Sequence, residues 1–237
     1  MKYIFLSVLL FCYTGKSFAQ ISKQEIGSEV GIVAAEVSGI QPPNNVIPNY
    51  GISVSIVGQY NFTDLFSIKS GLGFVEKGYA TTQVLYLQSN IDPKTGFTGN
   101  SGNINNYYPT SYIELPILAK ATFGKKIKFF ANAGPYFGLL LIAMENVSVN
   151  ETNQPPKSFS NNVTEYYKRV DMGICFGAGV EMPVKDKILL SLELRYDQGL
   201  MNVANTPPNN VPGVFGSQPV VNGAFSLLLG FRYRITD

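Results

Sequence analysis

The stretch that decides the fold is Lys187-Ile188-Leu189-Leu190-Ser191-Leu192-Glu193-Leu194-Arg195-Tyr196-Asp197. One side of its alternation is apolar, with Ile188, Leu190, Leu192, Leu194 and Tyr196. The other side includes Ser191, Glu193, Arg195 and Asp197. A period of two is typical of a β-strand whose two faces meet different surroundings, whereas a helix would scatter these charges around its surface. The stretch therefore predicts one strand with an apolar face and a charged face.

The same alternation recurs along the chain and predicts eight strands. It is clear in residues 112–123, 169–182, 187–197 and 221–235, and weaker in 27–37, 51–61, 66–77 and 127–141. Each segment supplies the roughly ten residues that a tilted strand needs to cross a bilayer. After residue 20 no apolar run reaches the ~20 residues of a membrane helix.

The connections between these segments alternate in length. Segments rich in Asn, Pro, Ser and Gly make the long connections 38–50, 78–107, 142–168 and 199–218. The short connections are 61–64, 124–126 and 183–186. This pattern is typical of membrane barrels, which have short periplasmic turns and longer extracellular loops. We therefore predict an all-β fold, an eight-stranded antiparallel up-and-down transmembrane β-barrel, with both ends of the chain on the periplasmic side.

The polar face of the strands is expected to line the interior of this barrel. The charges on this face nearly balance. They are six acidic and seven basic residues, namely the ten given below together with Glu29, Lys69 and Lys128. Buried charges are tolerated when they are paired and hydrogen-bonded. A soluble barrel, with the apolar face inward and the charges in water, remains an alternative. The ten charges expected to have a structural role in the lumen are Glu114, Lys120, Arg169, Asp171, Glu181, Glu193, Arg195, Asp197, Arg232 and Arg234.

The N-terminus has the pattern of a signal peptide. Lys2 precedes an apolar run over residues 3–13, which is too short to span a bilayer as a helix. Ser17 and Ala19 then form a small-x-small cleavage site. We expect residues 1–19 to be a cleaved signal peptide and residues 20–237 to be the barrel domain. Cleavage would leave Cys175 as the one cysteine of the exported chain.

Residue types argue against an enzyme. The chain has no His, which removes Ser/His/Asp triads, Cys/His pairs and His-based zinc sites. Cys175 is therefore expected to serve packing, and Glu193 and Asp197, which flank Arg195, to form structural ion pairs. No catalytic residue, cofactor or metal is expected. An eight-stranded interior is just wide enough for side chains to fill, so a general porin is not expected.

Aromatic residues are expected to form girdles at the two membrane interfaces. Tyr60, Phe62 and Phe66 flank the first short turn. The aromatics near the long connections are Tyr79, Tyr107, Tyr108, Tyr166 and Tyr167.

Three motifs point to a known family. The first and most specific is Tyr112-Ile113-Glu114-Leu115-Pro116-Ile117-Leu118-Ala119-Lys120. The others are Asp171-x-Gly173-x-x-x-Gly177-x-Gly179-x-Glu181 and Glu193-Leu194-Arg195-Tyr196-x-x-Gly199-Leu200. The chain resembles the PorT-like outer-membrane β-barrel proteins over essentially its whole mature length. The resemblance implies an OmpA-like eight-stranded barrel in the outer membrane of a Gram-negative bacterium. The founding member is linked to protein secretion and gliding, a role that we do not transfer to this chain.

The expected function is that of an outer-membrane barrel with a filled lumen and a structural or docking role through its long extracellular loops. A narrow small-solute channel, a component of an outer-membrane secretion apparatus and a soluble binding barrel are the alternatives. Expected partners are outer-membrane lipid and other envelope proteins. The net charge of +2 and the lack of a Lys/Arg-rich stretch argue against nucleic acid. The sequence predicts no oligomeric state.

Overall fold

The computed structural model describes residues 24–39, 45–86, 91–92, 96–97, 101–151, 155–205 and 219–235. The expected signal peptide, residues 1–19, lies outside the described residues. Within the described part, no helix is long and apolar enough to cross a membrane.

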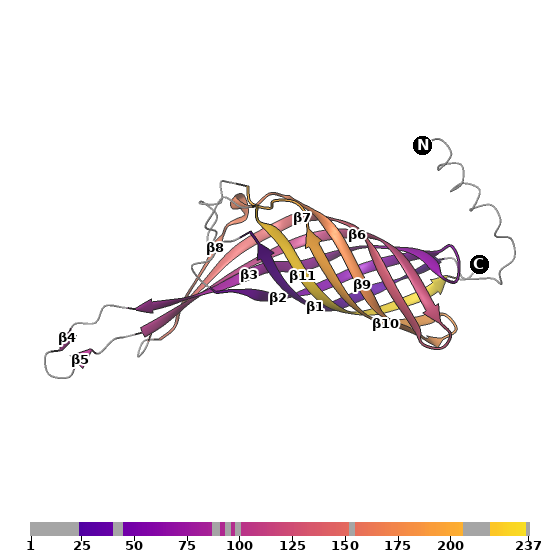
Figure 1. Cartoon of the computed structure of the whole chain (residues 1–237), viewed down its shortest axis with the longest axis horizontal. Helices are drawn as coiled ribbons and strands as arrows, with labels where there is room; N and C mark the ends of the chain where they lie inside the picture. The colour runs from indigo at the N-terminus through magenta and orange to yellow at the C-terminus, as the bar shows by residue number, and fades with distance from the viewer. Residues whose placement is uncertain are drawn as a thin grey trace.

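Eight antiparallel strands form a closed ring (Figure 1). Their order is β6-β3-β2-β1-β11-β10-β9-β7, and pairing between β7 and β6 closes the ring. Each strand pairs with the barrel strands before and after it in sequence, and β11 pairs with β1. The predicted fold, an eight-stranded antiparallel up-and-down barrel, is confirmed. The strands are β1(Gln24–Ser38), β2(Asn45–Asn61), β3(Phe66–Tyr86), β6(Ser101–Gly124), β7(Lys128–Glu151), β9(Val170–Lys185), β10(Ile188–Gly199) and β11(Val221–Ile235).

One end of the barrel carries the three short turns, and we call it the short-turn end. Gln24 pairs with Ile235 there, so the described chain begins and ends on the same side. The Thr63 hydroxyl of the β2–β3 turn accepts hydrogen bonds from the backbone N–H groups of Leu65 and Phe66. A side chain that takes the place of backbone acceptors in this way lets a four-residue turn reverse the chain tightly.

At the opposite, long-loop end, three strands continue past the barrel wall (Figure 1). β3 pairs with β6 out to Tyr86 and Ser101, and β6 pairs with β7 out to Gly102 and Glu151. β8(Lys157–Asn162) then pairs with β7 from Met144 onward. We call these outer parts of β3, β6 and β7, together with β8, the sheet extension. The described chain also has a two-stranded piece, β4(Ile91–Asp92) with β5(Gly96–Phe97), and a short 3-10 helix, η1(Thr164–Tyr166).

The sheet extension corrects the predicted loops 78–107 and 142–168, large parts of which are strand. The loops were predicted from their Asn, Pro, Ser and Gly content, and Asn, Pro and Gly are depleted in strands on average. Strand formation depends more on the neighbouring strand than on residue type, and here each strand meets a partner that continues its hydrogen-bond ladder.

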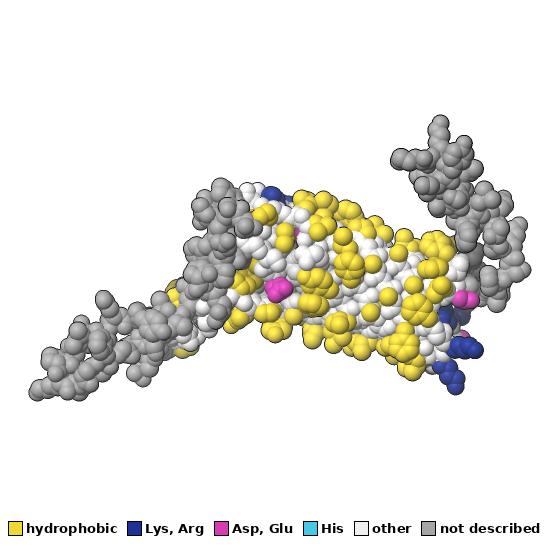
Figure 2. All heavy atoms as spheres, viewed as in Figure 1, with side chains coloured by type: hydrophobic (Ala, Val, Ile, Leu, Met, Phe, Trp, Pro, Cys, Tyr) yellow, Lys and Arg dark blue, Asp and Glu magenta, His cyan; other side chains and the backbone are white. Residues whose placement is uncertain are grey.

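The barrel is apolar outside and charged inside. On β10, Leu194 is 56% exposed while its neighbour Glu193 is 1% exposed. Hydrophobic side chains spread over the outer wall in Figure 2. A soluble barrel would have the reverse arrangement, so that alternative is wrong. An apolar outer wall over a polar interior is the arrangement of a barrel that stands in lipid.

The predicted aromatic girdles are found in part. Tyr60, Phe62 and Phe66 are exposed beside the first short turn, and Tyr107 is exposed on β6. Three aromatics predicted for the other girdle are instead buried, namely Tyr79, Tyr108 and Tyr167. Tyr79 and Tyr108 occupy inward register positions on β3 and β6, and Tyr167 is buried outside the strands, after η1. Distance from the loops alone does not reveal either arrangement.

Candidate functional site

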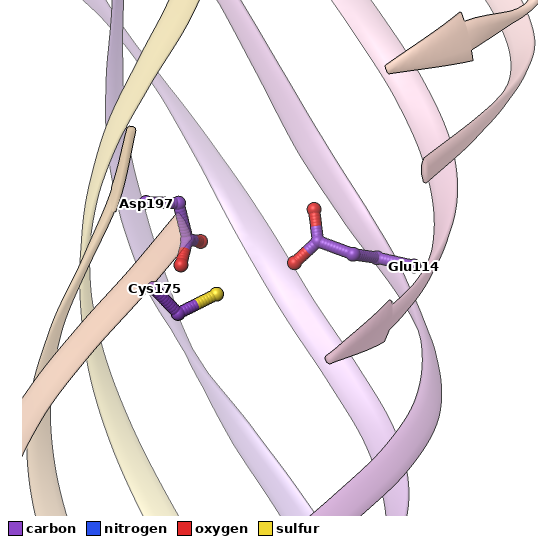
Figure 3. A group of neighbouring side chains, drawn as sticks. All are labelled: Glu114, Cys175 and Asp197. Carbon is purple, nitrogen blue, oxygen red and sulfur yellow. The ribbon is translucent and has the colours of Figure 1, made fainter. Parts of the chain in front are cut away.

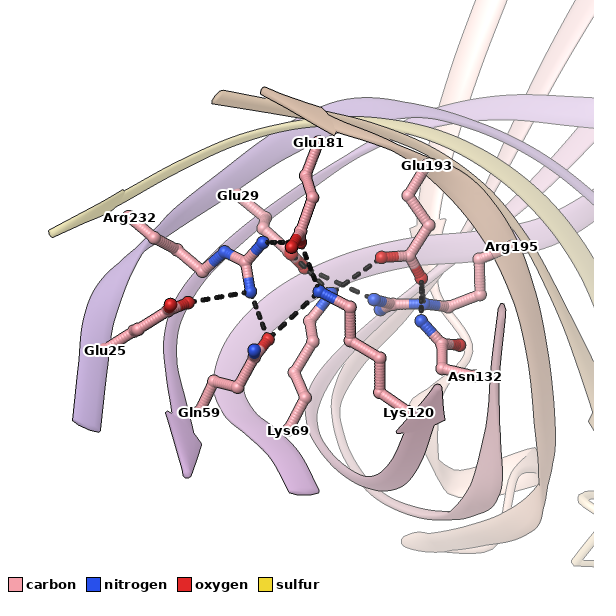
Figure 4. Close-up of polar contacts among 10 residues, drawn as sticks. All are labelled: Glu25, Glu29, Gln59, Lys69, Lys120, Asn132, Glu181, Glu193, Arg195 and Arg232. Carbon is pink, nitrogen blue, oxygen red and sulfur yellow. Dashed lines mark hydrogen bonds and ion pairs between the residues drawn. The ribbon is translucent and has the colours of Figure 1, made fainter. Parts of the chain in front are cut away.

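The charged interior is the candidate functional site, and its centre is an ion-pair network that joins opposite walls. The Lys69 Nζ atom lies 2.5 Å from a Glu29 carboxylate oxygen and 2.6 Å from one of Glu193. Arg195 donates to Glu193 over 2.9 Å and to Glu29 over 3.2 Å. Asn132 donates to the second Glu193 oxygen over 3.1 Å (Figure 4). We call these five residues the middle network.

A second network lies nearer the short-turn end. The Lys120 ammonium lies 2.5 Å from a Glu181 oxygen and 3.1 Å from the Gln59 side-chain oxygen. The Arg232 guanidinium donates to the same Glu181 and Gln59 oxygens and lies 3.2 Å from Glu25 (Figure 4). We call these five residues the lower network. Both Lys120 and Arg232 are almost fully buried.

The middle and lower networks are each electrically neutral. Each holds two acids and two bases, and each adds one uncharged amide side chain. Removing charges from water costs several kcal/mol per ion, and only close partners with further hydrogen bonds offset this. The pairing therefore allows long charged side chains to fill the barrel where water would otherwise stand.

A third group, the upper cluster, lies nearer the long-loop end. The Lys77 Nζ atom lies 2.6 Å from Glu114 and 3.8 Å from Asp171. Its ammonium also stands 4.2 Å from the centre of the Tyr136 ring, a favourable cation–π distance. The Tyr136 hydroxyl and the Asn222 amide donate to Asp171 over 3.1 and 2.9 Å. Cys175 and Asp197 are buried in the same part of the barrel and complete the upper cluster.

Above this cluster, nearer the long-loop end, three tyrosines are buried: Tyr79, Tyr108 and Tyr167. The Tyr79 and Tyr108 rings stack with their centroids 4.7 Å apart. The Tyr108 hydroxyl donates to Glu145 over 3.1 Å. Tyr167 follows η1 outside the strands, and burial raises its pKa to about 12, so the phenol stays neutral at ordinary pH.

The structure brings most of the predicted lumen charges together. Arg234 is at the short-turn end, part-buried, 3.4 Å from Glu25. Arg169 is a correction, because it is exposed and its guanidinium donates to the carbonyls of Leu140 and Leu141. It directly precedes β9, where the inward alternation has not yet begun. The eight that are buried in the interior are Glu114, Lys120, Asp171, Glu181, Glu193, Arg195, Asp197 and Arg232.

Sequence reasoning missed several interior residues. Lys77 shares its register with Lys69 on β3, so continued alternation along that strand would have found it. Glu25 shares its register with Glu29 on β1 but precedes the predicted start of that strand. The amide side chains of Gln59 and Asn132 carry no charge and gave no signal.

One family model and several solved structures are similar to this chain. The family model described as outer membrane protein beta-barrel domain matches residues 18–205. Among solved structures, the chain is similar to neisserial surface protein A, with 12% identity, a TM-score of 0.44, and coverage of 90% of this chain and 97% of that one. It is also similar to OprG of Pseudomonas aeruginosa, with 10% identity, a TM-score of 0.46, and coverage of 90% of this chain and 96% of that one. A third similar structure is a major outer membrane protein of Thermus thermophilus, with 14% identity, a TM-score of 0.46, and coverage of 90% of this chain and 99% of that one.

No curated protein matches this sequence. The family model covers most of the chain, and its description agrees with the closed ring, the apolar outer wall and the charged interior. The chain therefore belongs to the outer membrane protein beta-barrel domain family and is a bacterial outer-membrane β-barrel.

Proposed function

We propose that this protein is a side-chain-filled outer-membrane barrel that docks a partner protein through its sheet extension. The observation that carries the proposal is the extension itself, which continues β3, β6 and β7 beyond the barrel and adds β8. Membrane barrels place their longer connections on the extracellular side, so the extension faces away from the cell. A continuous sheet offers a binding partner a surface that is already ordered, which lowers the entropy cost of association.

The filled interior supports an anchoring role over a transport role. The middle and lower networks place buried Lys and Arg side chains across the lumen, each held by two or more carboxylate or amide partners. A solute that crossed the barrel would have to break these pairs. We propose, on the same grounds and because the chain has no His, that the barrel has no catalytic activity.

We also propose that, within the outer-membrane barrel family, this chain is related to the PorT-like proteins. The support for this relationship is the motif over residues 112–120, whose alternate positions turn inward. Tyr112, Glu114, Leu118 and Lys120 are all buried, with Glu114 in the upper cluster and Lys120 in the lower network. The motif thus corresponds to a strand that supplies one charge to the upper cluster and one to the lower network.

A photo-crosslinking experiment in intact cells tests the docking role. A photoreactive amino acid replaces Phe159 on β8, which is 58% exposed, and in a matched strain replaces Phe129 on the barrel wall, which is 59% exposed. We expect a discrete protein adduct from position 159 and none from position 129. Absence of a protein adduct at 159, or the same adducts at both positions, would overturn the proposal.

A further inference from the structure

The upper cluster has fewer positive charges than the two networks below it. It contains three buried carboxylates, those of Glu114, Asp171 and Asp197. In the part of the chain that the structure describes, the buried ammonium that faces them is that of Lys77. The nearby Arg195 is hydrogen-bonded to Glu29 and Glu193 of the middle network. With all three carboxylates ionised, the cluster would carry two negative charges in excess, and burial makes such unpaired charge costly.

Two of these carboxylates and a thiol come together at one point. Cys175 on β9 and Asp197 on β10 are direct partners in the strand register, and both side chains point into the barrel. Glu114 reaches toward them from β6, which lies across β7 from β9 (Figure 3). One ligand atom from each residue, two carboxylate oxygens and the sulfur, lie within 4.8 Å of one another.

The Asp197 carboxylate is incompletely satisfied. Its side chain is almost fully buried, and its Oδ1 atom has no hydrogen-bond partner within the described part of the chain. Cys175 lies beside it on the neighbouring strand. In Figure 3 the Asp197 oxygens and the Cys175 sulfur point toward the interior, facing the Glu114 carboxylate. A buried acceptor without a donor normally signals an unseen partner, such as a water molecule or an ion.

We propose that Glu114, Cys175 and Asp197 form a binding site for a divalent cation of the zinc type. Zinc takes thiolate and carboxylate ligands in a tetrahedral arrangement, and a thiolate disfavours magnesium and calcium. Ligand atoms around tetrahedral zinc stand about 3.5 Å apart, so the three side chains need to close by about an ångström. Water supplies the fourth ligand.

The change in charge that accompanies cation binding favours it. The cation brings two positive charges, and the Cys175 thiol releases one proton to solvent as it becomes a thiolate. The upper cluster thereby goes from two excess negative charges to one. The Asp197 oxygen without a donor gains a ligand bond. Asp197 is two residues from the end of β10, so the site lies nearer the long-loop end.

Titration of the refolded full-length chain with Cd²⁺ tests the proposal, because a cadmium–thiolate bond absorbs in the ultraviolet. A Cys12→Ser background leaves Cys175 as the one thiol. We expect an absorption band that saturates at one Cd²⁺ per barrel and that Zn²⁺ abolishes by competition. The Cys175→Ser substitution removes the band. No band from the background protein would overturn the proposal, whatever the other variants do.

Two carboxylate variants separate ligation from charge. Glu114→Gln or Asp197→Asn removes a ligand, and we expect Cd²⁺ affinity to fall by more than about 100-fold. Asp171→Asn removes the same charge but no ligand, so the loss should stay within about 100-fold. Heat-modifiable gel mobility verifies that each variant is folded. Unchanged affinity in both folded ligand variants would mean that the thiol binds metal alone, and would overturn the three-residue site.

Discussion

Lys69 on β3 and Glu193 on β10 stand on opposite walls of the barrel, yet the ammonium nitrogen and a carboxylate oxygen are 2.6 Å apart. The two strands are four positions apart in either direction around the ring. A contact of this kind ties opposite walls together across the interior. It also places a bonded pair where a solute path would run.

Replacement of Lys69 by Met should destabilise the barrel by about 3–5 kcal/mol, because it leaves two buried carboxylates, Glu29 and Glu193, with Arg195 as their one remaining cation in the middle network. Urea unfolding in lipid vesicles, followed by gel mobility because the chain has no Trp, measures the change. Lys187→Met, at an exposed position in the β9–β10 turn, is the control and should alter stability little. Equal stability of the two variants would contradict the role given to Lys69.

The same pair predicts the conductance of the protein. Wild-type barrels refolded into a planar bilayer should show no stepwise current, because the middle network fills the lumen. The double substitution Lys69→Ala with Glu193→Ala should produce small current steps, since it removes the pair that crosses the lumen. Stepwise current from the wild type would contradict the filled-barrel interpretation and favour a narrow channel.

A side chain at Gly177 on β9 is predicted to force its neighbours in the middle network to shift. A Cβ atom there would lie 2.5 Å from the Asn132 side-chain oxygen and 2.7 Å from a Glu193 oxygen. Gly177→Ala should therefore displace both partners of the middle network and lower stability by about 1–3 kcal/mol. Gly58→Ala is the matched control, because the nearest atom to its Cβ is a backbone oxygen at 4.0 Å. The urea midpoints of the two variants should differ clearly, and coincident midpoints would count against close packing at Gly177.

The lipid-facing wall predicts a depth-dependent effect of charge. Leu192 lies near the middle of β10 and is 41% exposed, so Leu192→Arg should cost about 2–4 kcal/mol in a bilayer. Leu200 follows the last residue of the same strand and is 64% exposed, and Leu200→Arg should cost no more than about 1 kcal/mol. Folding yield and stability in vesicles measure both. A larger defect at 200 than at 192 would place the bilayer elsewhere on the barrel.

Alternation was enough to predict the ring of strands and the faces of residues such as Glu193 and Leu194, because burial in a barrel follows the period of the strand. It could not predict which charges meet. Lys69 contacts Glu29 and Glu193 because strand register and tilt bring three distant segments to one level, and neither quantity can be read from residue type.

The sequence predictions that were wrong also have local causes. In the sequence, Arg169 continues the alternation of β9. The strand begins one residue later, and the Arg169 side chain donates to the Leu140 and Leu141 carbonyls. Tyr79 and Tyr108 look like interfacial aromatics until their inward register is known. The outer parts of β3, β6 and β7 resemble loops in composition and form strands because each has a neighbour to pair with.

The sheet extension restricts how the outward-facing part of this protein can diverge. In an unpaired loop, residues can be added or lost with little consequence. In β7 beyond Ala143, which pairs with β6 on one side and β8 on the other, one inserted residue would reverse the facing of all that follow. Related barrels under pressure to change this surface, for example to escape antibodies or phages, should therefore vary it by substitution at constant strand length.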